Sequence, residues 1–252
     1  MKKLLLILLI IGLTAYLFVG CAPTVPTEGE GEGEGEGEEE VSRVVMVELF
    51  SQDGCASCAK VEPILEQLAD EYERSEVVLL EERAYGPYSL DEIRDRYNWY
   101  LPSSSDRGTP NILFNGLYYK IHGDSTYVAI KSKIVLALGK DAKIKITTVR
   151  NSDSSTTTIT GTIENISSTS LDDLAINGMA FKNRGEEGLK YSVLDIFAEQ
   201  KVSIATFEPG AIQNFSFTLE NINWEGNNIH GAIFVQDENS LKKEILQAFY
   251  IE

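Results

Sequence analysis

The sequence predicts an α/β domain at residues 42–140, followed by an all-β sandwich at residues 141–252. In the first segment, strand and helix patterns alternate, which is typical of a layered structure with parallel strand pairs. In the second segment, short β-rich runs are separated by turn residues, which is typical of two packed antiparallel sheets. The roughly 210 residues that follow the N-terminal region are enough for two domains of ordinary size.

The first elements of the α/β segment are a strand, a helix and a second strand. The run "VVMVELF" at residues 44–50 is apolar and rich in β-branched residues, which is typical of a buried strand. From Cys55 to about Tyr72, apolar residues recur at helical spacing with acidic residues on the opposite face. The run "EVVLLEE" at residues 76–82 predicts the second strand.

A second helix, a hairpin and a third helix complete this segment. Ser89 and Glu92 have the spacing of a capping box and predict the start of the second helix. The stretch "TPNILFNGLYYKIHG" predicts a hairpin with a type I′ turn at Asn115 and Gly116. Residues 125–138 then place their apolar side chains on one face, as a helix does.

Seven or eight short runs of strand character make up the second segment. Their spacing over about 110 residues predicts an immunoglobulin-like sandwich. Antibody domains have a cysteine pair in the core, whereas this segment contains no cysteine. Packing alone must therefore hold its core together.

The N-terminus has the order of a bacterial export signal. Lys2 and Lys3 precede an apolar run at residues 4–19, and a small residue and then Cys21 follow. This order resembles the lipobox of bacterial lipoproteins. The resemblance implies a signal peptide at residues 1–20, a lipid on Cys21 and an extracytoplasmic, membrane-anchored location. The alternative is an uncleaved anchor, although 16 apolar residues are fewer than the roughly 20 that a spanning helix needs.

A tether is expected at residues 21–41, between this anchor and the fold. Residues 28–40 consist of eight glutamates, which repel one another, and five glycines, so they cannot bury apolar surface. A membrane spacer is favoured because a lipid anchor precedes it, and a solubilising filler is the alternative.

The chain is acidic, with a formal charge of −17. Without Lys2, Lys3 and the eight tether glutamates, residues 41–252 carry a formal charge of −11. This excess of acid argues against nucleic acid as a partner and against electrostatic docking on anionic lipid.

Cys55 and Cys58 stand three residues apart, where a strand is followed by a helix. They are the two remaining thiols if Cys21 carries a lipid, and an extracytoplasmic location permits a disulfide between them. Free N–H groups and the dipole at a helix N-terminus favour a thiolate at Cys55. One sulfur can then attack a disulfide, and the other can resolve the intermediate.

Two alternatives to a reactive pair remain open. The first is a permanent local disulfide that has no chemistry. The second is half of a metal site, which needs more ligands than this chain offers. Its two histidines, His122 and His230, lie in different predicted segments. We therefore expect no metal and no other cofactor.

Three features of residues 44–138 resemble the thioredoxin superfamily. They are "CASC" after the strand, Pro63 five positions beyond the second cysteine, and "GTP" at residues 108–110. The resemblance implies an α/β thioredoxin-like domain that exchanges disulfides with protein cysteines.

The resemblance also implies a role for individual residues. Cys55 is the nucleophile and Cys58 is the resolving thiol. Pro110 follows a cis peptide bond and faces the cysteine pair, and the carbonyl group of Thr109 pairs with the substrate backbone.

Two further residues are assigned with departures from the family pattern. Glu48 falls near the family's buried acid, displaced by one residue, and is expected to take the proton of Cys58. The alternative is a solvent-linked glutamate at the strand end. Gly54 stands where the family has tryptophan, and it is assigned with Thr109 to the substrate-binding surface. The Ala-Ser dipeptide between the cysteines leaves the direction of electron flow open.

Two functions are therefore considered. The first is a membrane-anchored thiol–disulfide oxidoreductase whose partners are protein thiols or disulfides, together with a redox partner in the membrane. The second is a non-catalytic surface binding or assembly lipoprotein that uses the thioredoxin-like fold as a scaffold. The layout, including "GAIFVQDENSLKKEILQA" at residues 231–248, also resembles bacterial surface lipoproteins that join a thioredoxin-like domain to a β-sandwich.

Overall fold

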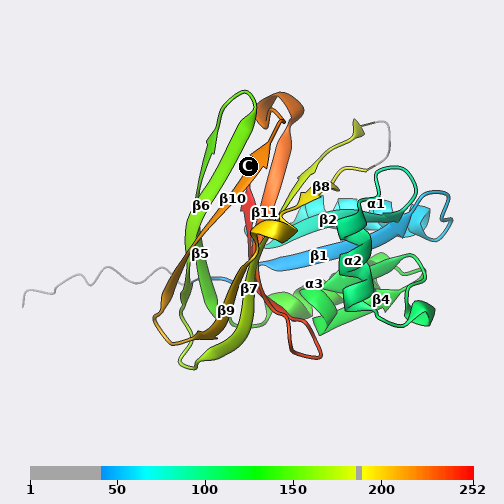
Figure 1. Ribbon diagram of the computed structural model, residues 1–252. Coiled ribbons are helices and arrows are strands. Elements are labelled where there is room, and N and C mark those ends of the chain that lie inside the picture. The colour runs from blue at the N-terminus through cyan, green and yellow to red at the C-terminus, as the bar shows by residue number, and fades with distance from the viewer. Residues whose placement is uncertain (1–40, 186–188) are drawn as a thin grey trace, which may run out of the picture. The chain divides into compact units, whose positions relative to one another are not determined.

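The computed structural model describes residues 41–185 and 189–252, which fold around two packed sheets (Figure 1). The predicted signal peptide at residues 1–20, the lipidation site Cys21 and nearly all of the tether at residues 21–41 lie outside the described residues. Within the described ranges, no helix is both long enough and apolar enough to cross a membrane.

Every strand and α-helix predicted between residues 44 and 138 is present. These elements are β1 (Val45–Gln52), α1 (Cys58–Glu71), β2 (Val77–Tyr85), α2 (Asp91–Tyr100), β3 (Asn111–Phe114), β4 (Tyr119–His122) and α3 (Tyr127–Leu138). The strands that follow are β5 (Ile144–Ser152), β6 (Thr156–Asn165), β7 (Leu171–Lys182), β8 (Ser192–Ile196), β9 (Val202–Phe207), β10 (Ile212–Glu220), β11 (Ile229–Asp237) and β12 (Ile245–Ile251).

Among the described residues, nine strands form one mixed sheet and three form a second sheet. The large sheet has the order β12-β11-β7-β8-β2-β1-β3-β4, and β9 pairs with β7. In this sheet β2 is parallel to both β1 and β8, whereas the other neighbours are antiparallel. The small sheet has the order β10-β6-β5 and is antiparallel.

The predicted fold class, an α/β thioredoxin-like domain plus an all-β, immunoglobulin-like sandwich domain, is wrong. The described chain is mostly β, and strands from both sides of residue 140 share the large sheet. Strand β8 pairs with β2 at Ser192 and Glu81, and the backbone N–H of Tyr191 donates to the Glu81 carboxylate at 2.9 Å. Sequence patterns predict strands well, but they do not show that the free edge of β2 is closed by a segment 110 residues later in the chain.

Helices cover both faces of the sheet around β1. Phe50 faces α2 and stacks on Tyr97 with ring centroids 4.6 Å apart, and Glu48 faces the same helix. Ser51, the next residue along the strand, lies on the other face beside Glu62 of α1. Successive side chains of a strand alternate between its faces, so β1 divides its residues between the two helices. A second apolar core lies between the small sheet and strands β7, β11 and β12.

The β3–β4 turn is longer than the predicted two-residue turn. Asn115 and Gly116 both have positive φ, of 50° and 69°, but β3 and β4 pair at Phe114 and Tyr119, so four residues connect the strands. A side chain at position 116 would collide with the backbone carbonyl of Lys243, which makes glycine necessary there. The turn is therefore packed directly against the β11–β12 loop.

A buried acid cluster joins β1, β2, α2 and β11. Arg96 Nε donates to Glu48 Oε1 at 2.6 Å, and the hydroxyl of Tyr100 donates to the other oxygen at 2.8 Å. Gln236 Nε2 donates to the same hydroxyl at 2.7 Å. Burial raises the pKa of Glu82 well above its usual value, and the charge of Glu48 adds to this effect. Arg96 forms its ion pair with Glu48, and its charge lowers the pKa of Glu82 by less than burial raises it.

The buried carboxyl group of Glu81 should make the stability of the fold depend on pH. Burial raises the pKa of Glu81 to about 8, although a hydrogen bond from the Tyr191 N–H opposes the shift. The unfolded chain loses this proton near pH 4.5, so the folded state binds more protons between the two values. The free energy of unfolding should therefore fall by roughly 1.5 kcal/mol from about pH 6.5 to about pH 8 for Glu81 alone, as measured by urea unfolding.

Two variants isolate the contribution of Glu81 to this prediction. Glu81→Gln resembles the neutral carboxyl and should reduce the fall, whereas Glu220→Gln, at an exposed position, should leave it unchanged. Burial lowers the pKa of His230, and that group acts in the opposite direction below about pH 6.5, outside the chosen range. Equal stability at both pH values contradicts the prediction.

Candidate functional site

The cysteine pair lies in the connection between β1 and α1. Cys55 and Cys58 form a disulfide with Cα atoms 5.2 Å apart. Helix α1 begins at Cys58, three residues later than predicted, but the N–H of Ala59 donates to the Cys55 carbonyl at 3.1 Å. Cys55 therefore accepts the first backbone hydrogen bond of this turn. Gly54 is exposed, and its φ of 69° is one that favours glycine.

The two sulfur atoms are in different environments. Cys58 is only 1% exposed, whereas Cys55 is half-buried at the surface. The backbone N–H of Cys58 points back and donates to Cys55 Sγ at 3.1 Å. An attacking partner from outside can thus approach Cys55, and Cys58 lies behind it.

The Thr109–Pro110 peptide bond is cis, and Thr109 lies next to the cysteine pair. Its carbonyl oxygen and its Oγ1 are each 3.6 Å from Cys55 Sγ. Two hydrogen bonds hold the loop in place. Asn111 Nδ2 and the Tyr97 hydroxyl donate to the carbonyl oxygen of Gly108, the residue before Thr109, at 2.7 and 3.2 Å. In the reduced protein, the Thr109 hydroxyl and the Cys58 N–H are both placed to donate to a thiolate at Cys55.

Glu48 is not brought to the cysteine pair. Its carboxylate is fully buried on the α2 face of β1, where Arg96 and Tyr100 bind it. Helix α1 and Cys58 lie on the opposite face. The sequence predicted correctly that Glu48 lies within the strand before the cysteines. Side chains alternate between the two faces of β1, however, and the Glu48 side chain lies on the face opposite α1.

The structure brings two acidic residues near the pair, the exposed Asp53 and the more buried Glu62, and sequence reasoning missed Glu62. It lines a hollow of about 340 Å³ beside the disulfide. The hollow is lined by Gln52, Asp53, Gly54, Cys55, Ala56, Cys58, Ala59, Glu62 and Arg83. Burial raises the pKa of Glu62, and the Arg83 guanidinium, whose Nη1 is 3.2 Å from Glu62 Oε1, opposes this. The signal in the sequence was the spacing of four residues between Cys58 and Glu62, which places them on one face of α1.

Each of the two histidines has a hydrogen-bond partner, and His122 lies against Gly108 in the loop before Thr109. His122 Nδ1 is 3.1 Å from Asn111 Oδ1, and His230 Nδ1 is 2.7 Å from the Tyr250 hydroxyl. Residues 41–185 and 189–252 contain no group of three or more His, Cys, Asp or Glu side chains that could hold a metal ion.

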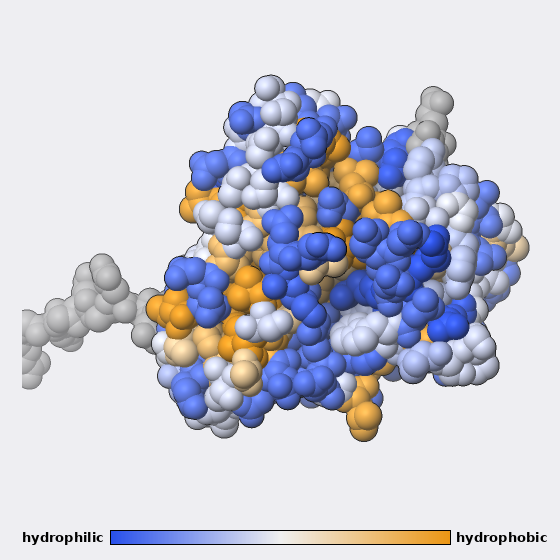
Figure 2. Space-filling model, in the orientation of Figure 1, coloured by the Kyte–Doolittle hydropathy of each residue, from blue (hydrophilic) through white to orange (hydrophobic). Residues whose placement is uncertain are grey.

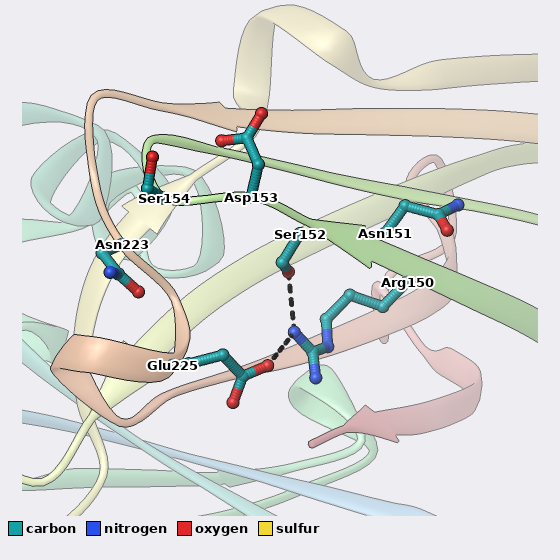
Figure 3. Close-up of a pocket in the computed structure, with 7 residues that line it drawn as sticks. All are labelled: Arg150, Asn151, Ser152, Asp153, Ser154, Asn223 and Glu225. Carbon is teal, nitrogen blue, oxygen red and sulfur yellow. Dashed lines mark hydrogen bonds and ion pairs between the residues drawn. The ribbon is translucent and has the colours of Figure 1, made fainter.

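A polar hollow at the end of the β5–β6 hairpin is a separate feature (Figure 3). Arg150 crosses it and donates to Glu225 at 2.6 Å and to Ser152 at 2.7 Å. Asp153 accepts two backbone hydrogen bonds from its own turn. Because these charged groups already have partners within the fold, this hollow is a weaker candidate than the cysteine pair.

Comparison with known proteins adds information on the fold. No family model matches this sequence, and no curated protein matches it. The structure is similar to that of HBP35 of Porphyromonas gingivalis, with a TM-score of 0.66 and 16% identity over 84% of this chain and 76% of the other. It is also similar to protein AGR_C_4864 of Agrobacterium tumefaciens, with a TM-score of 0.58 and 16% identity over 85% and 95% of the two chains. These similarities show a shared fold that extends over most of the chain.

Proposed function

We propose that this protein is an extracytoplasmic thiol–disulfide oxidoreductase that acts on protein cysteines through Cys55 and Cys58. One observation carries the proposal: the half-buried sulfur of Cys55 lies between the Cys58 N–H at 3.1 Å and the Thr109 Oγ1 at 3.6 Å. Both groups donate toward the sulfur, so they favour the thiolate, which is the nucleophile in disulfide exchange.

The reaction proceeds in two displacements. The Cys55 thiolate attacks a substrate disulfide, one substrate sulfur leaves as a thiolate, and a mixed disulfide forms. Cys58 then loses its proton and attacks Cys55 Sγ, which releases the second substrate thiolate and restores the Cys55–Cys58 disulfide. Two electrons pass from the protein dithiol to the substrate, and the reverse sequence oxidises a substrate dithiol.

Neighbouring residues support each displacement in this scheme. The Thr109 carbonyl, 3.6 Å from Cys55 Sγ, can accept a hydrogen bond from the N–H of a substrate chain lying across the pair. Glu62, on the same face of α1 as Cys58, accepts the proton of the resolving thiol. The Arg83 guanidinium, 3.2 Å from Glu62 Oε1, stabilises the ionised carboxylate of Glu62 before it accepts this proton.

The proposed location follows from the N-terminal sequence. A lipid on Cys21 would anchor the chain to a bacterial membrane outside the cytoplasm, where disulfides persist. Val41 enters the fold before β1, and the cysteines follow the other end of this strand. A strand of eight residues is about 25 Å long, so the pair lies well away from the point where the tether joins.

An exchange assay tests the proposed function. The full chain should reduce insulin, or oxidise reduced ribonuclease, in at least one glutathione buffer. Cys55→Ser should abolish this activity, because the first displacement needs that sulfur. Cys21→Ser makes the same chemical change outside the pair and should retain the activity in detergent. A parent chain that is inactive in every glutathione ratio would contradict the proposal.

A further inference from the structure

Four lysines gather on one surface of this acidic protein. Lys120, Lys133 and Lys242 line a hollow between the β3–β4 turn, α3 and the β11–β12 loop. Lys133 Nζ and Lys140 Nζ lie 5.2 and 5.8 Å from the ring centres of Tyr119 and Tyr118. Among the described residues, none of the four lysines forms an ion pair with a carboxylate.

Two leucines are exposed among these lysines. Leu241, at the tip of the β11–β12 loop, is 96% exposed, and Leu136 on α3 is 50% exposed. Leu136 lies three residues after Lys133, so the two share one side of α3, and Lys140 follows just beyond the end of this helix. We call these four lysines and two leucines the lysine face. Apolar surface protrudes at the β11–β12 loop in Figure 2, at the position of the red loop in Figure 1.

The loop that carries Leu241 is held in place. The backbone carbonyl of Lys242 accepts a hydrogen bond from the N–H of Leu117 at 2.8 Å. The side chain of Lys243 lies over the Trp99 ring, with Nζ 4.3 Å from its centre, and donates to the Trp99 carbonyl. The backbone of Lys243 also packs against Gly116. The fold therefore presents Leu241 to solvent on a supported loop.

The chemistry of the lysine face fits an anionic lipid surface. Ammonium groups attract lipid phosphates, and tyrosine rings and aliphatic side chains suit the boundary between headgroups and acyl chains. The net charge of −11 for residues 41–252 argues against such docking only if charge is spread evenly. Here four lysines without a carboxylate ion pair among the described residues lie on one surface. The local charge is therefore complementary to a membrane that the protein as a whole would avoid.

The entry point of the chain supports the same partner. Val41 lines a hollow together with Leu138, Gly139 and Lys140, so the tether joins the fold beside the lysine face. If Cys21 carries a lipid, residues 22–41 span at most roughly 65 Å, and the face lies within reach of the bilayer that holds the anchor.

We propose that the lysine face docks on anionic phospholipid, with Leu241 and Leu136 entering the headgroup region. The β3–β4 turn and the β11–β12 loop lie at the start of β1, whereas the cysteine pair follows its end. In Figure 1 the β1–α1 connection is at the right and the β11–β12 loop is at the bottom. Docking therefore leaves Cys55 open to solvent, and the inference does not depend on the redox activity.

Hydrogen exchange on vesicles tests this inference. The full chain is incorporated into vesicles of phosphatidylcholine alone or of phosphatidylcholine with phosphatidylglycerol. The backbone N–H groups of residues 238–244 should exchange about tenfold more slowly on the anionic vesicles, and added salt should remove the difference. Equal exchange on both kinds of vesicle would overturn the inference.

Matched variants locate the contact. Lys120→Glu with Lys242→Glu should abolish the protection. Lys145→Glu with Lys182→Glu makes the same charge change elsewhere, at two lysines that also have no ion pair among the described residues, and should preserve the protection. Leu241→Ser should weaken the protection, and Ile212→Ser, at another exposed position, should not. None of these residues lines the hollow at Cys55, so each variant should keep the disulfide-exchange activity of the parent chain. Retained activity shows that a variant is folded, and lost protection in such a variant is then a loss of docking alone. Protection that survives Lys120→Glu with Lys242→Glu assigns the contact to another surface.

Discussion

Replacing Cys58 with alanine should convert the protein into a trap for its substrate. Cys55 remains half-buried and accessible, so the first displacement still forms a mixed disulfide. The second displacement needs the buried sulfur of Cys58, which is 1% exposed and which no external thiol can readily replace. A disulfide-containing peptide should therefore accumulate on Cys55 of Cys58→Ala, as detected by mass spectrometry without reductant. Absence of any adduct, in a variant that remains folded, would show that Cys55 is not the attacking sulfur.

Glu62 should affect the second displacement and not the first. Glu62→Gln removes the proposed acceptor of the Cys58 proton, so the mixed disulfide should persist about 100 times longer or more. Its rate of formation should stay close to that of the parent chain. Glu66→Gln is the matched control, because Glu66 lies on the same helix and pairs with Lys190 outside the hollow. Resolution at the parent rate in Glu62→Gln would remove Glu62 from the mechanism.

Replacing Arg96 with methionine should destabilise the fold by about 3–5 kcal/mol. Its guanidinium donates to Glu48 at 2.6 Å, to Tyr100 at 2.7 Å and to Gln236 at 3.2 Å. Methionine keeps much of the volume, but it leaves the fully buried Glu48 carboxylate without its counter-ion, beside Glu82. Urea unfolding at neutral pH measures the loss.

Two comparisons separate this effect from a general cost of losing an arginine. Arg94→Met, on the same helix, removes a partly exposed ion pair with Asp91 and should cost less than about 1 kcal/mol. Glu48→Gln in the Arg96→Met background removes the stranded charge and should restore part of the stability. A loss in Arg96→Met no greater than in Arg94→Met contradicts this account of the acid cluster.

Local structure was largely predictable from the sequence. Periodicity gave β1, α1 and β2, and the strand–CxxC–helix order placed Cys55 and Cys58 at the start of α1. The position of Thr109 and Pro110 beside the pair depends on the predicted hairpin as well. Its first strand, β3, pairs with β1, and Asn111, the residue after Pro110, lies opposite Phe50. These features depend on short segments whose side-chain patterns are strong.

Long-range features were not predictable in the same way. The pairing of β8 with β2 depends on which strand covers the free edge of β2. The pattern of apolar and polar residues in either strand does not identify its neighbour. Glu48 was assigned by its depth in the strand, but a shift of one residue moves a side chain to the other face, and this determines its partner. Glu62 could have been found from its spacing to Cys58, but the raised pKa needs the burial that only the fold provides.

The pH dependence of Cys55 alkylation tests the central claim most directly. In the reduced Cys21→Ser chain, Cys55 and Cys58 are the only thiols, and mass spectrometry distinguishes them. We expect Cys55 to react first and to reach half its maximal rate well below about pH 8.5, the midpoint of an ordinary thiol. Thr109→Val should move this midpoint upward, because one donor to the thiolate is lost. A Cys55 that reacts no faster than Cys58, or with an ordinary midpoint that Thr109→Val does not change, would contradict the account.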